Sequence, residues 1–280
     1  MPTESLAVPA VCEPPPKPSL VSFLRRNVSE MYRFRFALAS FVANTLRKRY
    51  HRSALGFFWS LLVPLGTMGS MAFMFSLVFE LPFKTYAMYI FSGMAPWGFV
   101  CAATQSGAQS LLLGEPFLKR VYVPKPLFPF ITTTTELVNF IFTMASLYVL
   151  AMLFGIFPGV NVIFLPLAIA ILYVFCLGLA MACAVATVYS RDLTHIISVV
   201  TSILTYALPI IYQMDQVPVK YHYIFYLNPF FYVIDMFRKI MLSAALAPMD
   251  MITPLIIALV AFGGGVLAVK AKENDLVFRL

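Results

Sequence analysis

A border between a basic run and a long apolar stretch constrains this chain more than any other feature. Residues 47–52 read Arg-Lys-Arg-Tyr-His-Arg, and the stretch from Ala54 to Phe79 contains no Asp, Glu, Lys or Arg. Such a stretch exceeds the roughly 20 residues that an α-helix needs to cross about 30 Å of hydrocarbon. The chain is therefore expected to enter a membrane here, with the basic residues on the cytoplasmic side.

The overall composition agrees with an integral membrane protein. Hydrophobic residues make up 61% of the 280 residues, charged residues make up 11%, and the mean hydropathy is +0.85. A soluble domain carries nearer 25% charged residues. The net charge of +8 follows the membrane borders, which argues against nucleic acid as a partner.

The apolar pattern predicts an all-α membrane protein with six transmembrane helices and membrane lipid around it. Residues 1–21 read as a disordered cytoplasmic tail and residues 22–52 as an amphipathic interfacial helix. Residues 53–270 read as a six-span transmembrane domain and residues 271–280 as a second cytoplasmic tail. The spans fall at about 54–79, 86–113, 131–155, 162–188, 194–212 and 251–269. Residues 213–250 are predicted to form short re-entrant or interfacial helices on the outer side, because charges interrupt them. The interfacial helix could instead be an ordinary solvated helix.

The distribution of basic residues predicts the orientation. Of the 20 Lys and Arg residues, 16 fall on one predicted side, together with both termini, and 4 fall on the other. Because Lys and Arg accumulate in cytoplasmic loops, both termini are expected in the cytoplasm.

Three predicted spans carry polar residues at helical spacing. In the order of span 2, span 3 and span 5, they are Gly98, Gln105 and Gln109; Thr132, Glu136, Asn139, Thr143 and Ser146; and Thr194, Ser198, Thr201, Thr205 and Tyr212. Such stripes serve either helix packing or a polar conduit. Glu136 is the most costly of these residues in lipid, so a neighbouring basic residue is expected to pair with it. A proton relay through Glu136 is not supported, because the predicted spans contain no second acid.

Aromatic residues make up 15% of the chain, and many lie near span ends, as interfacial belts do. Trp59, Trp97 and Phe91, which shares the face of the span 2 stripe, could instead line a path for sugar rings. Belt or core packing is the alternative for each of them.

Motifs for catalysis and for cofactors are missing from the sequence. It contains no G-x-x-x-x-G-K-[ST], H-E-x-x-H or G-x-S-x-G, and its four cysteines form no C-x-x-C. The three histidines are far apart. We therefore expect a chain that is not an enzyme and holds no metal or cofactor.

Several motifs in order resemble the membrane subunits of polysaccharide ABC exporters, which export O-antigen, capsule or teichoic acid. The first runs from Arg49 to Pro64, with Tyr50, Ser53, Leu55-Gly56, Trp59 and Pro64 in the family's order. Further matches are Leu118–Lys125, Tyr189–Leu193, Pro209–Tyr212, Val217-Pro218, Leu227–Pro229 and Arg238. The resemblance covers about residues 25–275.

This resemblance implies a homodimer in the bacterial inner membrane, working with a separate ABC ATPase subunit that binds ATP and Mg. The loop at about 114–126 would dock on the ATPase through Glu115, Lys119, Arg120 and Lys125. An undecaprenyl-type lipid-linked glycan would pass along the dimer interface. Arginine pairs well with phosphate oxygens. The candidates for binding the lipid pyrophosphate are therefore Arg47, Arg49 and Arg52.

The resemblance and the polar stripes together give candidates for the substrate path or its gate. They are Tyr50, Ser53, Gly56, Trp59, Phe91, Trp97, Gln105, Gln109, Asn139, Thr143 and Tyr212. Two other functions stay open at this stage. One is the permease of a drug or small-lipid ABC exporter, and the other is an integral membrane enzyme acting on lipid-linked sugars.

Overall fold

The structure, a computed structural model, describes residues 20–50, 58–119, 123–156, 159–273 and 275–276. Within these residues all regular secondary structure is helical. The helices are α1 (Leu20–Arg33), α2 (Arg35–Tyr50), α3 (Phe58–Val78), α4 (Phe83–Leu118), α5 (Leu127–Leu153), α6 (Leu165–Tyr189), α7 (Leu193–Ala207), α8 (His222–Tyr226), α9 (Pro229–Met241) and α10 (Met249–Lys272). Short 3₁₀ turns are η1 (Val160–Phe164), η2 (Met214–Gln216) and η3 (Val219–Tyr221). The predicted tail at 1–21 lies almost entirely outside the described residues.

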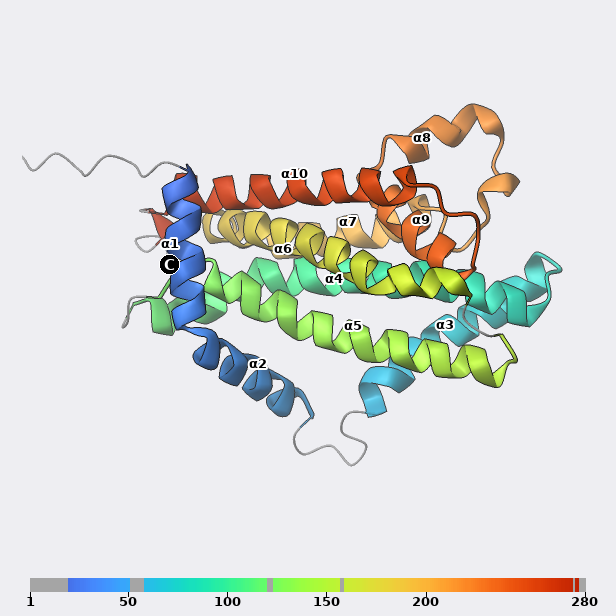
Figure 1. The fold of residues 1–280 in the computed structure, drawn as a ribbon, viewed down its shortest axis with the longest axis horizontal. Coiled ribbons are helices and arrows are strands. Elements are labelled where there is room, and N and C mark those ends of the chain that lie inside the picture. Colours follow the sequence, from blue (N-terminus) through green and yellow to red (C-terminus); the bar gives the residue numbers. More distant parts are fainter. Residues whose placement is uncertain (1–19, 51–57, 120–122, 157–158, 274, 277–280) are drawn as a thin grey trace, which may run out of the picture.

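Four helical segments are long and apolar enough to cross a membrane. They are α4, α5, η1 with α6, and α10, and they run side by side along the long axis of the molecule (Figure 1). Two further apolar helices are shorter, namely Leu62–Val78 within α3 and Leu193–Ala207, which is α7. The all-helical membrane class is thus confirmed, and four of the six predicted spans have full spanning length.

Two predicted boundaries are wrong for identifiable reasons. Span 5 was expected to reach Tyr212, but α7 ends at Ala207 and Leu208 is extended with φ −87° and ψ 147°. Pro209 follows, and a residue before proline is pushed out of the helical region. At the other end, α4 continues past residue 113 to Leu118, where Glu115 and Lys119 form an ion pair of 2.6 Å one turn apart.

The predicted single helix at 22–52 is two helices that meet at Phe34. α1 crosses the ends of the long helices, and α2 begins beside α5 and runs obliquely away from the bundle (Figure 1). The bend places Leu38 of α2 in a small buried cluster with Leu127 and Ile131 of α5. The change of direction therefore lets the chain pack on the start of α5 and also cover the bundle end.

The tightest packing joins α4, α6 and α10 through small residues. A methyl group on Gly107 of α4 would overlap Ala180 of α6, and one on Gly178 of α6 would overlap the backbone at Ala261 and Phe262 of α10. Small residues let helix backbones approach closely, which is how membrane helices associate without a hydrophobic driving force. These three helices form the rigid centre of the fold.

The segment between α7 and α10 folds back on the opposite end of the bundle from α1 (Figure 1). Its main helix, α9, begins after Asn228, whose side-chain oxygen accepts a hydrogen bond of 3.0 Å from the Phe230 backbone N–H. Pro229 occupies the first turn of this helix, where a missing N–H costs nothing. With 13 residues, α9 is too short to span, as predicted.

Candidate functional site

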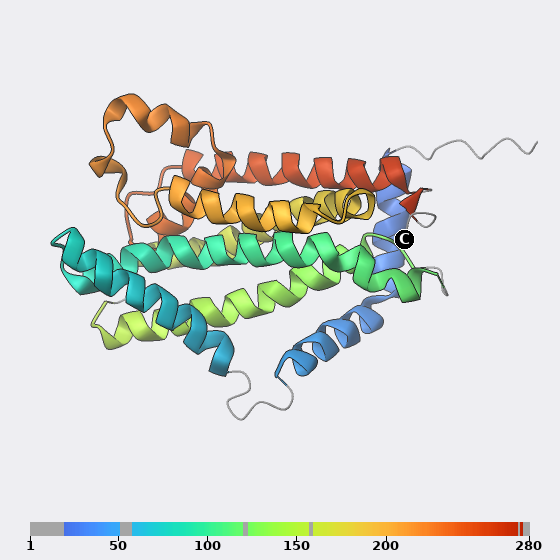
Figure 2. The same ribbon diagram turned by 180° about the vertical axis from the view of Figure 1, so that it is seen from behind.

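One side of α4 is left uncovered between α3 and α7. Both helices lie on the same side of α4, in front of it in the view of Figure 2. Along α4, Gly98 and Gln109 are exposed and Gln105 is half-buried. We call the outward side of α3 and α7, together with this α4 stripe, the open face. The structure thus brings the predicted span 2 stripe to a surface of the chain.

The helix α7 contributes a largely bare apolar surface to the open face. Of its 15 residues, all of which the structure describes, Ile197 alone is buried. The exposed large side chains are Ile196, Val199, Val200, Ile203 and Tyr206. Helix α3 likewise exposes Leu62, Val63, Phe73, Met74, Leu77 and Val78. Exposed apolar area of this extent faces either lipid or another protein.

Two side-chain hydrogen bonds join α7 to α4. Trp97 Nε1 donates to Thr205 Oγ1 at 2.7 Å, and Gln105 Nε2 donates to the Thr194 carbonyl at 3.2 Å. The hydroxyls of Thr201 and Thr205 also donate to carbonyls one turn back in α7, each at 2.8 Å. The Thr201 and Thr205 hydroxyls are therefore satisfied within the chain, and Thr205 helps to hold α7 against α4.

Two aromatic path candidates lie in the core. Phe91 and Trp97 are each 2% exposed, and the Trp97 ring packs edge-on against Phe230 with 5.4 Å between ring centroids. Phe91 shares the helical face of the open stripe, but α9 and the segment after α7 cover this end of α4: Ile210 and Arg238 come close to Gly93. For both aromatics the packing alternative holds within this chain.

Other candidates at the N-terminal end are described only in part. Trp59 is 51% exposed on α3, and Arg47 is exposed on α2. Tyr50 and Arg49 belong to the α2 backbone, but their side chains lie outside the described part. Ser53, Gly56, Arg52 and Arg120 lie outside the described residues altogether, so these candidates stay predictions.

The polar stripe of α5 lies on the other side of α4 from α7 (Figures 1 and 2). Glu136 is 7% exposed and accepts a hydrogen bond of 3.0 Å from Asn139 Nδ2. Thr143 donates to the Asn139 carbonyl at 3.0 Å. The three stripes therefore do not line one conduit inside a single chain. The predicted basic partner of Glu136 stays a prediction.

An aromatic and cationic anchor fixes the break after α7. Arg238 of α9 is 9% exposed, donates to the Pro209 carbonyl at 2.8 Å and lies 3.9 Å above the Tyr89 ring. The Tyr89 hydroxyl donates to the Tyr212 carbonyl at 2.8 Å, and Tyr86 donates to the Ile211 carbonyl. The carbonyls that have no helical partner after the end of α7 thus find buried donors.

Tyr86 and Tyr89 were not among the predicted residues, although their spacing of three places both on one face of α4. That spacing, beside a proline-broken span, was the available signal. Tyr212, a predicted path residue, is half-buried and its hydroxyl donates to the Ala207 carbonyl at 3.2 Å. It therefore belongs to the turn that ends α7.

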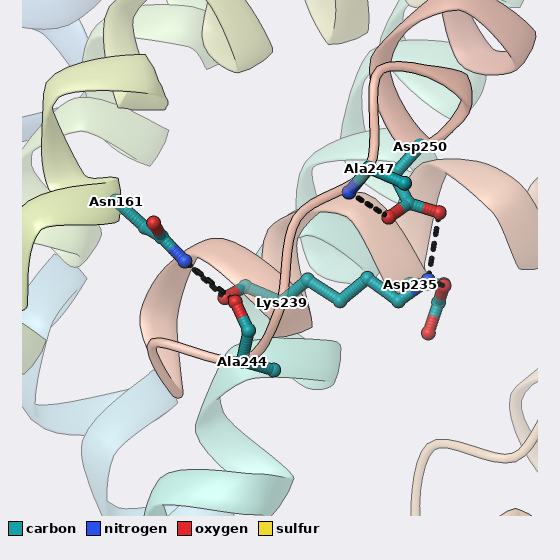
Figure 3. Close-up of polar contacts among 6 residues, drawn as sticks. All are labelled: Asn161, Asp235, Lys239, Ala244, Ala247 and Asp250. Atoms are coloured by element: carbon teal, nitrogen blue, oxygen red, sulfur yellow. Dashed lines mark hydrogen bonds and ion pairs between the residues drawn. The ribbon is translucent and has the colours of Figure 1, made fainter.

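A polar network holds α9 to the start of α10 and to η1 (Figure 3). Lys239 Nζ lies 2.7 Å from Asp250 Oδ1 and 2.9 Å from Asp235 Oδ2. Asn161 Nδ2 donates to the Ala244 carbonyl at 2.7 Å. Burial lowers the pKa of Lys239, but the hydrogen bonds and charges of Asp250 and Asp235 outweigh it and raise that pKa above its usual value. Asp235 and Asp250 thus serve to fix α9.

The opposite end of the bundle carries the predicted docking residues. Lys119 is exposed beside Glu115 at the end of α4. Lys125 instead donates to the Glu273 carbonyl, and Arg26 of α1 reaches the Glu273 carboxylate at 2.6 Å. Burial lowers the pKa of Lys125. The charge of Arg26 lowers this pKa further, and the charge of Glu273 partly opposes the shift. The loop after α4 is therefore tied to α1 and to the end of α10.

Side chains that could bind a metal are scattered over the part of the chain that the structure describes. No three His, Cys, Asp or Glu side chains come together there in a way that could hold an ion. Cys101, Cys176 and Cys183 are free thiols in the apolar spans. Cys176 is buried and the other two are half-buried, so these cysteines pack as small apolar side chains.

The chain is similar in sequence to a family of transporters and to several named permeases. The family described as ABC-2 type transporter matches residues 36–242. An O-antigen export system permease protein RfbA of Myxococcus xanthus is 30% identical over 192 residues, which cover 69% of this chain and 74% of that protein. Two RfbA permeases of Klebsiella pneumoniae are 24% and 23% identical over 202 residues, covering 72% of this chain and 78% of each relative.

The family match spans the open face, the anchor and the segment that folds back over the bundle. It leaves out α1 and the whole of α10. The chain belongs to the ABC-2 type transporter family of membrane proteins.

Proposed function

We propose that this chain is the membrane subunit of an ABC exporter that carries a lipid-linked polysaccharide across the bacterial inner membrane. The observation that carries the proposal is the 30% identity over 192 residues to a protein named as an O-antigen export permease. The order of motifs from Arg49 to Arg238 supports the same substrate class. ATP hydrolysis belongs to a separate ATPase subunit, and this chain itself performs transport rather than catalysis.

The proposal includes six spans with both termini in the cytoplasm. The apolar part of α3, 17 residues from Leu62 to Val78, is about 26 Å long at 1.5 Å per residue, close to the thickness of the hydrocarbon. Helix α7 crosses the membrane together with the buried residues that follow it. The break in the helix is tolerated there because Arg238 donates a hydrogen bond to the Pro209 carbonyl. The α1–α2 region lies in the interface on the cytoplasmic side.

A homodimer would cover the open face. Pairing two copies through α3 and α7 buries the apolar side chains that a single chain leaves exposed, and places Gln105 and Gln109 of both copies beside each other. Amide side chains there can hydrogen-bond sugar hydroxyls. The undecaprenyl-type lipid would stay at the membrane-facing edge of this interface.

The docking and lipid-recognition roles follow the predicted residues. Glu115 and Lys119 at the end of α4, with Arg120 and Lys125 after it, form the surface for the ATPase. Arg47, Arg49 and Arg52 lie at the border where the lipid pyrophosphate would arrive, and a guanidinium pairs with phosphate oxygens in a bidentate fork. Membrane lipid is the other partner, and nucleic acid is not expected.

The test is depletion of this chain in its native bacterium, with surface glycan and lipid-linked polymer measured separately. Loss of surface glycan with accumulation of lipid-linked polymer inside is expected. Complementation with wild type should restore export, and complementation with the Arg47→Gln, Arg49→Gln double variant should not, at equal membrane abundance. Normal surface glycan after depletion would refute the polysaccharide substrate. In that case, co-purification with an ATPase encoded by a neighbouring gene would indicate a drug exporter, and its absence would indicate an unrelated role.

A further inference from the structure

An apolar cavity of about 410 Å³ lies between α1 and the ends of α6 and α10 that α1 crosses. Its walls include Met31 and Tyr32 of α1, Met181 of α6, and Phe262 and Val266 of α10. The volume falls within the range of about 300–1,000 Å³ that small-molecule sites occupy. The cavity is separate from the open face, because α6 and α10 cover the opposite side of the molecule from α3 and α7 (Figures 1 and 2).

The chemistry of the walls selects an apolar ligand. Apart from Asn27 and Tyr32, the side chains that line the cavity are hydrocarbon, aromatic or thioether groups. A sugar or nucleotide needs several convergent polar groups to fix its orientation, and these walls do not supply them. A flexible hydrocarbon chain needs only volume and contact, and Met side chains adapt well to irregular apolar surfaces.

An exposed cation lies against Tyr32, one of the residues that line the cavity. The Arg35 guanidinium lies 4.3 Å from the centroid of the Tyr32 ring and 4.7 Å from that of Phe36. These two rings are 67% and 73% exposed. Arg35 is exposed and has no carboxylate partner among the residues that the structure describes, and Arg33 nearby is exposed as well. Cations held on aromatic faces at a bundle end are suited to lipid headgroups.

We propose that this cavity binds one acyl chain of an anionic phospholipid, with the headgroup phosphate at Arg35. An apolar cavity beside an exposed cation is complementary to an amphiphile with a negative head. The ligand belongs to the leaflet at the α1 end of the bundle, because α1 lies across the helix ends there (Figure 1). The bound chain would fill the space beneath α1, which the Arg26–Glu273 ion pair of 2.6 Å already ties to the end of α10. This site does not depend on which substrate the protein exports.

The test uses the full chain in nanodiscs that contain a photoactivatable lipid. Phosphatidylglycerol with a diazirine in the middle of one acyl chain is compared with phosphatidylcholine that carries the same chain, and labelled peptides are identified by mass spectrometry. Labelling is expected to concentrate at Met31, Met181 and Val266. One arginine near an anionic surface changes binding about fivefold, so Arg35→Gln should lower the preference for phosphatidylglycerol by about that factor.

A matched pair of variants on α10 separates the cavity from the general lipid surface. Val266→Trp fills the cavity, whereas Leu259→Trp lies seven residues earlier on the same helical face, is 56% exposed in the wild type and does not line it. Val266→Trp should abolish labelling at Met31 and Met181, and Leu259→Trp should leave it intact. If Val266→Trp fails to fold, the Arg35→Gln comparison decides the matter.

Four results would overturn the proposal. The first is labelling spread evenly over the lipid-facing helices, and the second is equal labelling by the two lipids in wild type. The third is a strong rise in labelling when residues 1–19 are deleted, which would make the chain's own N-terminus the occupant. The fourth is suppression by unlabelled polyprenyl diphosphate but not by unlabelled phosphatidylglycerol, which would assign the cavity to the lipid carrier.

Discussion

The two sides of α4 are packed in opposite ways. On one side, α6 approaches α4 at Gly107 and α10 approaches α6 at Gly178 and Gly265, and at each of these glycines a methyl group would overlap the neighbouring helix. On the open face, α3 and α7 present large apolar side chains outward, and Gly98 of α4 has no atom near the place of a side chain. The same helix therefore has one side that is complete within the chain and one that is not.

This contrast follows from the physics of association in lipid. Lipid tails are as apolar as leucine, so helices associate through close packing and hydrogen bonds rather than through the hydrophobic effect. The α4–α6–α10 side has the small residues that close packing needs. The open face has two hydrogen bonds from α4 to α7, at Trp97 and Gln105. A partner surface can therefore replace lipid on the open face, whereas it cannot enter the other side.

The largest expected effect is selective crosslinking of the open face. In a background without native cysteines, single cysteines at Val200 or Ile203 of α7 should join two copies of the chain through a bis-maleimide in membranes. Both positions are exposed and, in a symmetric dimer, close to the same positions of the second copy. The measurement is the dimer band on a denaturing gel.

The matched controls are cysteines at Val260 and Leu267 of α10, which are 71% and 51% exposed on the other side. They should give monomer at the same reagent concentration. Equal dimer bands from α7 and α10 would mean that the contrast between the two sides does not determine assembly.

The second effect is destabilisation by a methyl group on the closed side. Gly265→Ala should lower the unfolding free energy by about 3 kcal/mol, because the new group would overlap the Gly178 carbonyl and the two backbones must separate. Gly263→Ala, two residues away, meets no atom within 4 Å and should be neutral or slightly stabilising. Thermal unfolding in one detergent measures both, and equal melting temperatures would show that α6 and α10 are not in close contact.

The third effect concerns the anchor that Arg238 forms with Tyr89 and the Pro209 carbonyl. Arg238→Met removes a charged hydrogen bond to the Pro209 carbonyl and the contact with the Tyr89 ring, and should cost about 2 kcal/mol. The loss of stability is reduced because the substitution also removes a cation that is costly to bury. Arg238→Lys keeps the charge and should recover part of the stability. A melting temperature unchanged by Arg238→Met would mean that the tyrosines alone hold the break after α7.

The sequence predicted the class of fold and the positions of the long helices because charge-free length has a direct physical meaning in a membrane. It did not locate the breaks at Phe34 and before Pro209. The first depends on where Leu38 finds a partner on α5. The second was readable from the proline, but the carbonyls in the break are bonded by Tyr86, Tyr89 and Arg238, which come from elsewhere in the chain.

The candidate site was predictable only in part, because helical periodicity defines a face but not its neighbour. Gln105 and Gln109 were placed correctly on one face of α4 with Gly98. The same rule placed Phe91 with them, yet the chain folds over that end of the helix and buries it. Periodicity also could not show that the stripes of α5 and α7 lie on opposite sides of α4 (Figure 2).

The smallest expected effect tests how firmly α7 is held. Trp97→Phe removes the hydrogen bond to Thr205 but keeps an aromatic ring against Phe230, so the unfolding free energy should fall by about 1 kcal/mol. Thr205→Val removes the same bond from the other side, and the double variant should cost little more than either single change, since both break one interaction. Amide hydrogen exchange across residues 193–207 should rise in all three variants while exchange in α6 and α10 stays unchanged. Equal protection of α7 in wild type and variants would show that packing, rather than this bond, fixes α7 and that the open face is as rigid as the closed one.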